Sequence, residues 1–201
     1  MSVKGKRVLI TGSSHGIGAA TAIAFAKEDC SIGLNYNRNP EGAEATAAKI
    51  RELGAPVEIY KADVALSEDC EAMVNAFIQR FGGIDVLVNN AGGALKIPRG
   101  EFIDMPVEYW NDQINLNLNA AAYTSRIAVR NMIENKVRGK IINVSSIHSL
   151  VTWVKRKMLP YCAGKAGLNM FTKALACEVA KYGINVNCIA PGFIMTKLSA
   201  R

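Results

Sequence analysis

Short apolar runs alternate along the chain with longer segments of helical periodicity, and this alternation restricts the fold more than any other feature. Six runs have the length and the β-branched or apolar content of buried strands. They are Arg7 to Thr11, Ser31 to Tyr36, Val57 to Lys61, Val86 to Asn89, Lys140 to Ser145 and Asn185 to Ile189. Strands that alternate with helices pair in parallel and are covered on both faces. The pattern therefore predicts an α/β fold with a doubly wound parallel sheet.

Five segments between these runs have helical periodicity, and several close on glycine, as helices tend to. They are Ile17 to Glu28, Gly42 to Leu53, Glu68 to Phe81, Val107 to Lys136 and Tyr161 to Lys181. The fourth is long for one helix, and its asparagines at 115, 117 and 119 are poor helix-interior residues. We therefore expect two helices that meet near Asn115 to Asn119, with a simple turn as the plainest alternative. No linker or repeat interrupts the chain, which predicts one domain over residues 1–201.

Composition excludes several classes of protein. Half of the 201 residues are hydrophobic and 20% are charged, as in ordinary globular proteins. The net charge of +7 is spread along the chain, and the one dense basic run, Lys155 to Lys157, is interpreted as a solvated loop rather than a nucleic-acid site. The positive charge would also favour phosphorylated cofactors or an acidic acyl carrier protein as partner.

Cysteine usage and the N-terminus indicate a cytoplasmic protein. The five cysteines are odd in number and form no C-x-x-C pair, so we expect neither disulfides nor a metal site. The first apolar run, Val8 to Ile10, is too short for a signal peptide or a membrane span.

A glycine-rich segment follows the first strand and opens the first helix, which is the context of a dinucleotide-binding turn. It reads Thr11-Gly12-Ser13-Ser14-His15-Gly16-Ile17-Gly18. Gly12 would permit the tight turn, Gly16 would let the backbone approach a pyrophosphate, and Gly18 would allow close helix packing. The spacing differs from G-x-G-x-x-G, and an ordinary loop is the alternative for this segment alone. In its context the segment predicts a Rossmann-like fold.

The end of the second strand indicates which dinucleotide is bound. An acidic residue there usually holds the ribose hydroxyls of NAD, but this chain reads Asn35-Tyr36-Asn37-Arg38-Asn39. No carboxylate would repel a 2′-phosphate, and Arg38 with His15 would approach it. We therefore favour NADP(H) as the cofactor, with NAD(H) as the alternative. The alternative for Arg38 is a solvated loop residue without a ligand contact.

Tyr161 and Lys165 stand four residues apart on a predicted helix, so they share one face. An ammonium beside a phenol lowers its pKa and lets it exchange protons near neutral pH. Ser145 and Ser146 end the fifth strand, at the sheet edge where ligands bind, and a hydroxyl there would stabilise a reacting oxygen. A serine nucleophile with His148 as base lacks the Gly-x-Ser-x-Gly elbow.

The chain resembles the short-chain dehydrogenases/reductases over essentially its whole length. The resemblance rests on Thr11-Gly12-x-x-x-Gly16-Ile17-Gly18, Asp63-Val64, Asn89-Asn90-Ala91-Gly92, Asn117, Ser146, Tyr161-x-x-x-Lys165 and Pro191-Gly192. It implies an enzyme that moves a hydride between a nicotinamide dinucleotide and a carbonyl or alcohol carbon. It also implies a homotetramer or dimer, with the helices after Asn117 and from Tyr161 packed between subunits.

The resemblance assigns roles to individual residues. Tyr161 would be the acid or base, Ser146 would polarise the substrate oxygen, and Lys165 would hold the nicotinamide ribose and lower the pKa of Tyr161. Asn117 would anchor a water for proton resupply. The implied cofactor contacts are Asp63 and Val64 at the adenine, Asn90, Ala91 and Gly92 at the adenosine, and Pro191, Gly192, Ile194 and Thr196 at the nicotinamide and pyrophosphate. The alternative for Asn89 and Asn90 is a structural role in fixing the central sheet, and the alternative for Ile194 is a position in the core.

Two departures from the family pattern concern the substrate side. The segment between Ser146 and Tyr161 has two residues more than is usual. The family normally continues past the sixth strand through a substrate-covering helical segment and a seventh strand, whereas this sequence ends at Arg201.

Three functions are open at this point. Ser145 to His148 and Asn35-Tyr36 lean slightly to a sugar or polyol dehydrogenase resembling glucose 1-dehydrogenases, and the basic surface leans to a 3-oxoacyl-carrier-protein reductase. A non-catalytic cofactor-binding regulator or scaffold is the alternative from another class, although it needs no set of Asn117, Ser146, Tyr161 and Lys165.

Overall fold

The protein is described from a computed structural model, which covers residues 2–95, 101–151 and 158–195. Two features named above, the basic run Lys155 to Lys157 and Thr196, lie outside the described residues.

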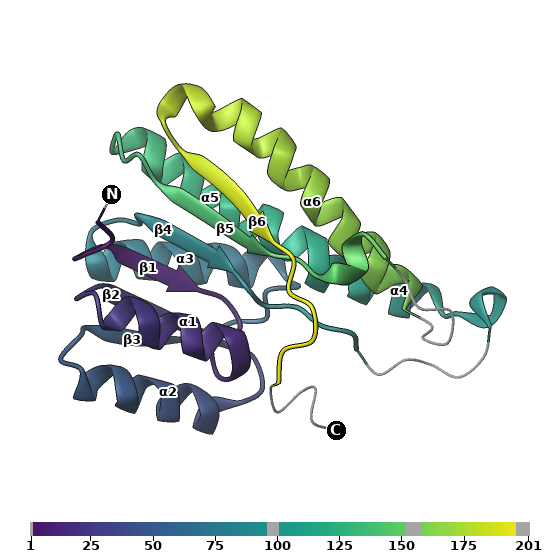
Figure 1. Cartoon of the computed structure of the whole chain (residues 1–201), viewed down its shortest axis with the longest axis horizontal. Helices are drawn as coiled ribbons and strands as arrows, with labels where there is room; N and C mark the ends of the chain where they lie inside the picture. Colours follow the sequence, from purple (N-terminus) through teal and green to yellow (C-terminus); the bar gives the residue numbers. More distant parts are fainter. Residues whose placement is uncertain (1, 96–100, 152–157, 196–201) are drawn as a thin grey trace.

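Six parallel strands form one sheet in the described part of the chain, in the order β3-β2-β1-β4-β5-β6 (Figure 1). The strands are β1 (Arg7–Ile10), β2 (Ser31–Tyr36), β3 (Val57–Lys61), β4 (Val86–Asn89), β5 (Lys140–Val144) and β6 (Asn185–Ile189). The order reverses between β1 and β4, so the chain leaves these two neighbours in opposite directions, and open α/β sheets bind ligands in a crevice at the carboxyl ends of two such strands. The predicted doubly wound sheet is confirmed.

The helices fall close to the predicted segments. They are α1 (Gly16–Ala26), α2 (Pro40–Glu52), α3 (Ser67–Phe81), α4 (Val107–Ile114), α5 (Ala120–Glu134) and α6 (Leu159–Val179), with short helical turns η1 (Phe102–Asp104), η2 (Asn115–Asn119), η3 (Ile147–Ser149) and η4 (Ala180–Tyr182). None of these described helices combines the length and apolar character needed to cross a membrane.

Two helices, α4 and α5, meet at Asn115 to Asn119 as predicted, and the alternative of a simple turn is not observed. Neither a turn nor a break separates α4 from α5, because η2 is a π-helical segment whose backbone stays helical on both sides. One residue too many for a regular α-helix is absorbed there, as is common near functional sites. The three asparagines are thus accommodated within a continuous helical run.

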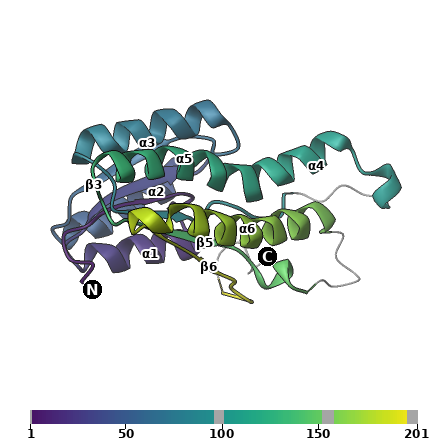
Figure 2. The ribbon, with the colours of Figure 1, turned by 90° about the horizontal axis from the view of Figure 1, so that it is seen from above.

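The sheet lies between two helical layers because alternate strand residues point to opposite faces. Val8 and Ile10 join an apolar cluster with residues of α1 and α2. Leu9 between them joins a second cluster with residues of α3, α5 and α6. Seen from above, α3 and α5 lie on one side of the strands and α1 on the other (Figure 2).

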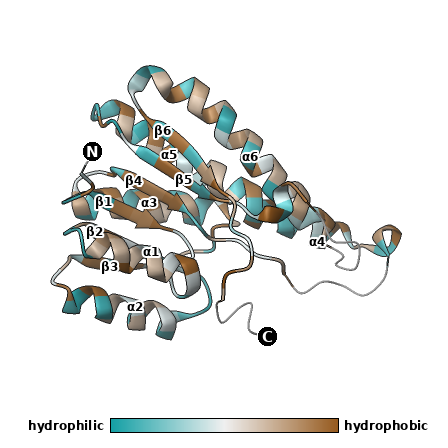
Figure 3. Ribbon diagram, in the orientation of Figure 1, coloured by the Kyte–Doolittle hydropathy of each residue, from teal (hydrophilic) through white to brown (hydrophobic). Residues whose placement is uncertain are grey.

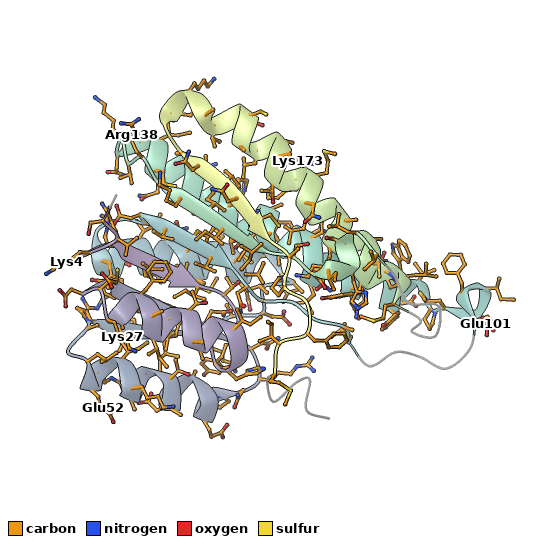
Figure 4. The ribbon with its side chains drawn as sticks, in the orientation of Figure 1. Lys4, Lys27, Glu52, Glu101, Arg138 and Lys173 are labelled. Carbon is orange, nitrogen blue, oxygen red and sulfur yellow. The ribbon has the colours of Figure 1, made fainter. Side chains whose placement is uncertain are left out.

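The distribution of polarity agrees with this layering. The central strands are mostly apolar, and the helices alternate between apolar and polar residues (Figure 3). Charged side chains such as Lys4, Glu52, Arg138 and Lys173 extend from the outer rim (Figure 4).

A buried polar row crosses the sheet; it consists of Thr124, Asn89, Asn143 and Thr172. Thr124 Oγ1 donates to Asn89 Oδ1 over 2.7 Å, and Asn89 Nδ2 donates to Asn143 Oδ1 over 2.9 Å. Asn143 Nδ2 then donates to Thr172 Oγ1 over 2.9 Å. The row therefore joins α5, β4, β5 and α6 through side chains, and its contacts support the structural alternative for Asn89.

We expect Asn143→Leu to lower the free energy of unfolding by about 1–3 kcal/mol, because buried partners would lose their hydrogen bonds. The double variant Asn143→Leu/Thr172→Val should lose less than the sum of the two single variants, since both partners of one bond go together. Urea denaturation measures both effects, and strictly additive losses would contradict the row. Asn187→Leu, an exposed strand asparagine, is the control and should change the free energy by less than about 0.5 kcal/mol.

Candidate active site

The glycine-rich turn follows β1 and lies against the segment that follows β4. Gly12 and Gly16 have φ angles of +61° and +60°, which side chains rarely adopt. A Cβ atom on Gly12 would lie 2.8 Å from the Cα atom of Ala91, so only glycine fits this approach. The structure thus brings the predicted turn and the predicted adenosine-side segment together.

Asn90 and Thr11 hold these two segments to each other. Asn90 Nδ2 donates to the carbonyl oxygens of Thr11 (2.9 Å) and Gly12 (3.0 Å). In return Thr11 Oγ1 accepts from the backbone N–H groups of Asn90 and Ala91, each over 3.0 Å. The side chain of Asn90 is therefore committed to shaping the turn, in agreement with its structural alternative.

Gly18 lets α1 approach the turn closely. A Cβ atom there would lie 2.5 Å from Asn90 Nδ2 and 2.6 Å from the carbonyl oxygen of Gly12. The absence of a side chain thus makes room for the Asn90 amide and for the backbone of the turn, in agreement with the expected close helix packing.

Asn35 is a site residue that sequence reasoning missed, because it was considered only as a missing carboxylate. It is buried at the end of β2. Its Oδ1 accepts from the N–H of Gly12 over 3.0 Å, and its Nδ2 donates to the carbonyl oxygen of Ala62 over 3.1 Å. The signal was a polar residue inside an otherwise apolar strand, and its function is to fasten the turn to β2 and β3.

The start of α1 fits the pyrophosphate of a dinucleotide. The N-cap residue His15 makes no capping hydrogen bond, and the first turn, which includes Ile17, contains no acidic side chain. The Nδ1 atom of His15 lies 2.9 Å from Ser14 Oγ. Oriented N–H groups beside a glycine turn of this shape match a bound anion.

The predicted adenosine-side residues follow β2 and β3. Arg38 is exposed after β2, as its role toward a phosphate requires. Asp63 Oδ1 accepts from the N–H of Ala65 over 3.0 Å, and the N–H of Asp63 donates to Asp69 Oδ2 over 2.7 Å. Val64 is buried in the core beside them. The segment around Asp63 is thus held in a defined turn at the carboxyl edge.

Ser146, Tyr161 and Lys165 come together at the carboxyl end of β5. The Ser146 hydroxyl lies close enough to Tyr161 to lower the pKa of the phenol as a hydrogen-bonding group. Ser146 Oγ also accepts from the backbone N–H of His148 over 3.2 Å. The neighbouring Ser145 points elsewhere, since its Oγ donates to the carbonyl oxygen of Lys165 over 3.1 Å. The structure therefore separates a serine at the tyrosine from one that anchors α6.

Burial controls the protonation of this group. It raises the pKa of Tyr161 above its ordinary value, although the hydrogen bond with Ser146 acts in the opposite direction. Burial also lowers the pKa of Lys165 to about 8. Lys165 Nζ donates to the carbonyl oxygen of Val144 over 2.8 Å. The expected lowering of the Tyr161 pKa by Lys165 is not observed, because burial raises this pKa and the group that acts against burial is Ser146.

Among the three asparagines of η2, Asn117 alone is buried. Its Oδ1 accepts from the N–H of Gly93 over 2.9 Å, and its Nδ2 donates to the carbonyl oxygen of Gly93 over 3.1 Å. Asn119 Nδ2 donates to Asn115 Oδ1 over 2.7 Å. The π-helical segment thus turns Asn117 toward the segment after β4.

The segment after β6 lies beside the segment after β5 at the carboxyl edge of the sheet. The carbonyl oxygen of Pro191 accepts from the N–H of Ile147 over 3.0 Å, which joins it to η3. Gly192 and Ile194 are exposed, so a core position for Ile194 is not observed.

Comparisons with known proteins agree with this geometry. The family model described as short chain dehydrogenase matches residues 6–201. The chain is 39% identical over 198 residues to 3beta-hydroxysteroid dehydrogenase 1 of Eggerthella lenta, and this alignment covers 98% of this chain and 74% of that protein. It is 35% identical over 195 residues to Glucose 1-dehydrogenase 2 of Bacillus subtilis, and this alignment covers 96% of this chain and 73% of that protein.

A solved structure has the same fold. The short chain dehydrogenase from Burkholderia cenocepacia J2315 in complex with NADP superposes with a TM-score of 0.89 at 32% identity, covering 98% of this chain and 78% of that one.

Proposed function

The chain belongs to the short-chain dehydrogenase family and is an oxidoreductase, and from this premise we propose that it interconverts a ketone and a secondary alcohol with NADP(H). The proximity of the Tyr161 and Ser146 hydroxyls, with the buried Lys165 one helical turn from Tyr161, is the observation that carries the proposal. It supplies a proton donor and an oxygen-binding hydroxyl at one place. A non-catalytic regulator needs no such group.

The bound nicotinamide would supply or accept the hydride. The glycine-rich turn and the start of α1 would hold the pyrophosphate, and Lys165 would hold the nicotinamide ribose. Ser146 would orient the substrate oxygen and stabilise its developing charge, while Tyr161 would give it a proton. Because its pKa is raised, Tyr161 stays protonated at neutral pH, which suits the reduction of a carbonyl. Asn117 would anchor the water that resupplies the proton.

We propose NADP(H) as the preferred dinucleotide, with Arg38 as its 2′-phosphate contact. Arg38→Gln should lower kcat/KM with NADPH about tenfold or more, because a hydrogen bond to a charged group contributes about 1.5–3 kcal/mol. The value with NADH should stay unchanged. Lys49→Gln, an exposed cation on α2, is the control. Equal losses with both dinucleotides would contradict the assignment.

Two substrate classes have support. The relative named Glucose 1-dehydrogenase 2 supports a sugar or polyol. Exposed apolar side chains on the segments after β5 and β6 support a 3-oxoacyl thioester, carried by an acyl carrier protein; they are Ile147, Leu150, Val151, Phe193 and Met195.

Initial rates test the proposal directly. NADPH and NADH oxidation would be measured with acetoacetyl thioester, and reduction of NADP and NAD with glucose, other polyols and a 3-hydroxysteroid. Turnover in one panel would identify the substrate class. Dinucleotide binding without turnover in any panel would contradict the proposed function.

We also infer a cytoplasmic homotetramer or dimer. Large apolar side chains are exposed on α6, one of the two helices expected between subunits; they are Leu159 and Met170, and such surface marks contact sites. A monomer in light scattering at micromolar concentration would contradict the assembly.

A further inference from the structure

Gln113 is a fully buried polar side chain at the closest approach of α4 to α6. A Cβ atom on Gly164 of α6 would lie 3.1 Å from Asn117 Cβ and 3.8 Å from the carbonyl oxygen of Gln113. A buried amide at such a contact loses its hydration, so it is retained only where its polar atoms are used.

The hydrogen bonds around Asn117 fix which atom of its side-chain amide is the donor. Because the N–H of Gly93 donates to Asn117 Oδ1, the other atom of that amide, Nδ2, must be the donor. This Nδ2 is shared among the carbonyl oxygen of Gly93, the carbonyl oxygen of Gln113 (3.0 Å) and Gln113 Oε1 (3.1 Å). Gln113 therefore presents two acceptors to Asn117.

The nitrogen of the Gln113 side chain also indicates that this residue serves as a hydrogen-bond acceptor. Gln113 Nε2 is buried and has no hydrogen-bond partner in the part of the chain that the structure describes. An amide that leaves its donor unsatisfied is unfavourable at a helix contact. Its placement is explained by the acceptor Oε1, which is engaged by Asn117.

The contact continues to Lys165. Gly92 has a φ of +158°, and a Cβ atom on it would lie 2.9 Å from both Asn117 Oδ1 and Lys165 Nζ. Asn117 Oδ1 and Lys165 Nζ thus both lie beside Gly92, on the side where a side chain would begin. A shift of Asn117 would move this segment against Lys165.

We propose that Gln113 is a positioning residue for the reaction, which through Asn117 fixes the Gly92–Gly93 segment against Lys165. The inference rests on the proposed function and deepens it. Gln113 touches no reacting atom; its effect reaches the site through the two acceptors that it offers to Asn117.

Gln113→Met removes the side-chain acceptor at similar volume and should lower kcat about tenfold or more, because small misplacements near the reacting groups are costly. The alkaline limb of the kcat profile should move to higher pH, since displacement of the Gly92–Gly93 segment from Lys165 would admit water to Nζ and weaken the effect of burial on its pKa. Among the described residues, Cys188 on β6 is the titratable group that acts on the pKa of Lys165, and Tyr161 lies one turn away on the same helix. A change that merely loosened the fold would lower the melting temperature and leave this profile in place.

Hydrogen exchange of the Gly93 amide, followed by NMR without cofactor or substrate, gives a second readout. Gln113→Met should speed this exchange, whereas Gln113→Glu should keep it slow and keep most of kcat in mildly acidic buffer, where a buried carboxyl stays protonated and retains an acceptor. Gln79→Met on the exposed face of α3 is the matched control.

The outcomes separate the two proposals. A wild-type chain without turnover in any panel overturns the proposed function, while unchanged Gly93 exchange in Gln113→Met overturns the present inference whether or not the wild type is active. With an active wild type, an unchanged kcat and pH profile in Gln113→Met also overturns it. Equal losses in Gln113→Met and Gln113→Glu would do the same, because the second variant keeps the acceptor.

Discussion

Replacing Tyr161 with phenylalanine is expected to lower kcat by about 10²–10⁴-fold, the usual contribution of a positioned acid or base. The ring stays in place, and only the hydroxyl that contacts Ser146 is lost. Ser146 keeps the N–H of His148 as a hydrogen-bond partner, so the loop should remain folded. We therefore expect unchanged NADPH affinity, measured by fluorescence titration alongside initial rates.

The control for this change is Tyr182→Phe, which removes the same hydroxyl from an exposed tyrosine in η4. Its turnover should equal that of the wild type. If Tyr161→Phe also retains full turnover, Tyr161 is neither acid nor base and the proposed mechanism is wrong.

The second large effect is expected at the glycine-rich turn, where Gly12→Ala should weaken NADPH binding at least about tenfold. The new Cβ atom would meet the backbone of Ala91 at 2.8 Å, at a φ of +61° that is itself unfavourable. One of the two segments must move, which distorts the anion-binding turn. We expect the free energy of unfolding to fall by about 1–3 kcal/mol as well.

Gly54→Ala separates the effect of the positive φ angle from the effect of the contact with Ala91. Gly54 has a similar φ of +77°, but no atom lies within 4 Å of an added Cβ. This variant should lose about 1 kcal/mol of stability and keep the affinity for NADPH, as titration and urea denaturation would show. Equal losses of affinity in both variants would contradict the role of the Ala91 contact.

The strands and most helices were predictable because buried parallel strands read as short β-branched runs. No predicted boundary differs by more than two residues from the structure. The π-helical segment η2 was not predictable, because the partner of Asn117 lies 24 residues away at Gly93. The division into one domain over residues 1–201 stays a prediction.

Within the candidate site, the sequence placed Ser146, Tyr161 and Lys165 together because their elements follow one another at one edge of the sheet. The residue pattern alone did not separate Ser145 from Ser146, since two adjacent hydroxyls differ only in the direction that the backbone gives them; the family resemblance selected Ser146. Sequence reasoning also missed Asn35, whose partners Gly12 and Ala62 are set by strand pairing. The pKa of Tyr161 depends on burial, which the spacing of two residues on a helix does not reveal.

The buried polar row has a consequence for how related sequences diverge. Thr172 Oγ1 is the acceptor for Asn143 Nδ2, so a lineage that replaces Thr172 alone by an apolar residue leaves this donor buried and unsatisfied. Replacement of both by apolar residues of similar shape removes that penalty. Across an alignment of relatives we expect these two positions to covary, with amide and hydroxyl on one branch and two aliphatic residues on another, even though 29 residues separate them in the chain.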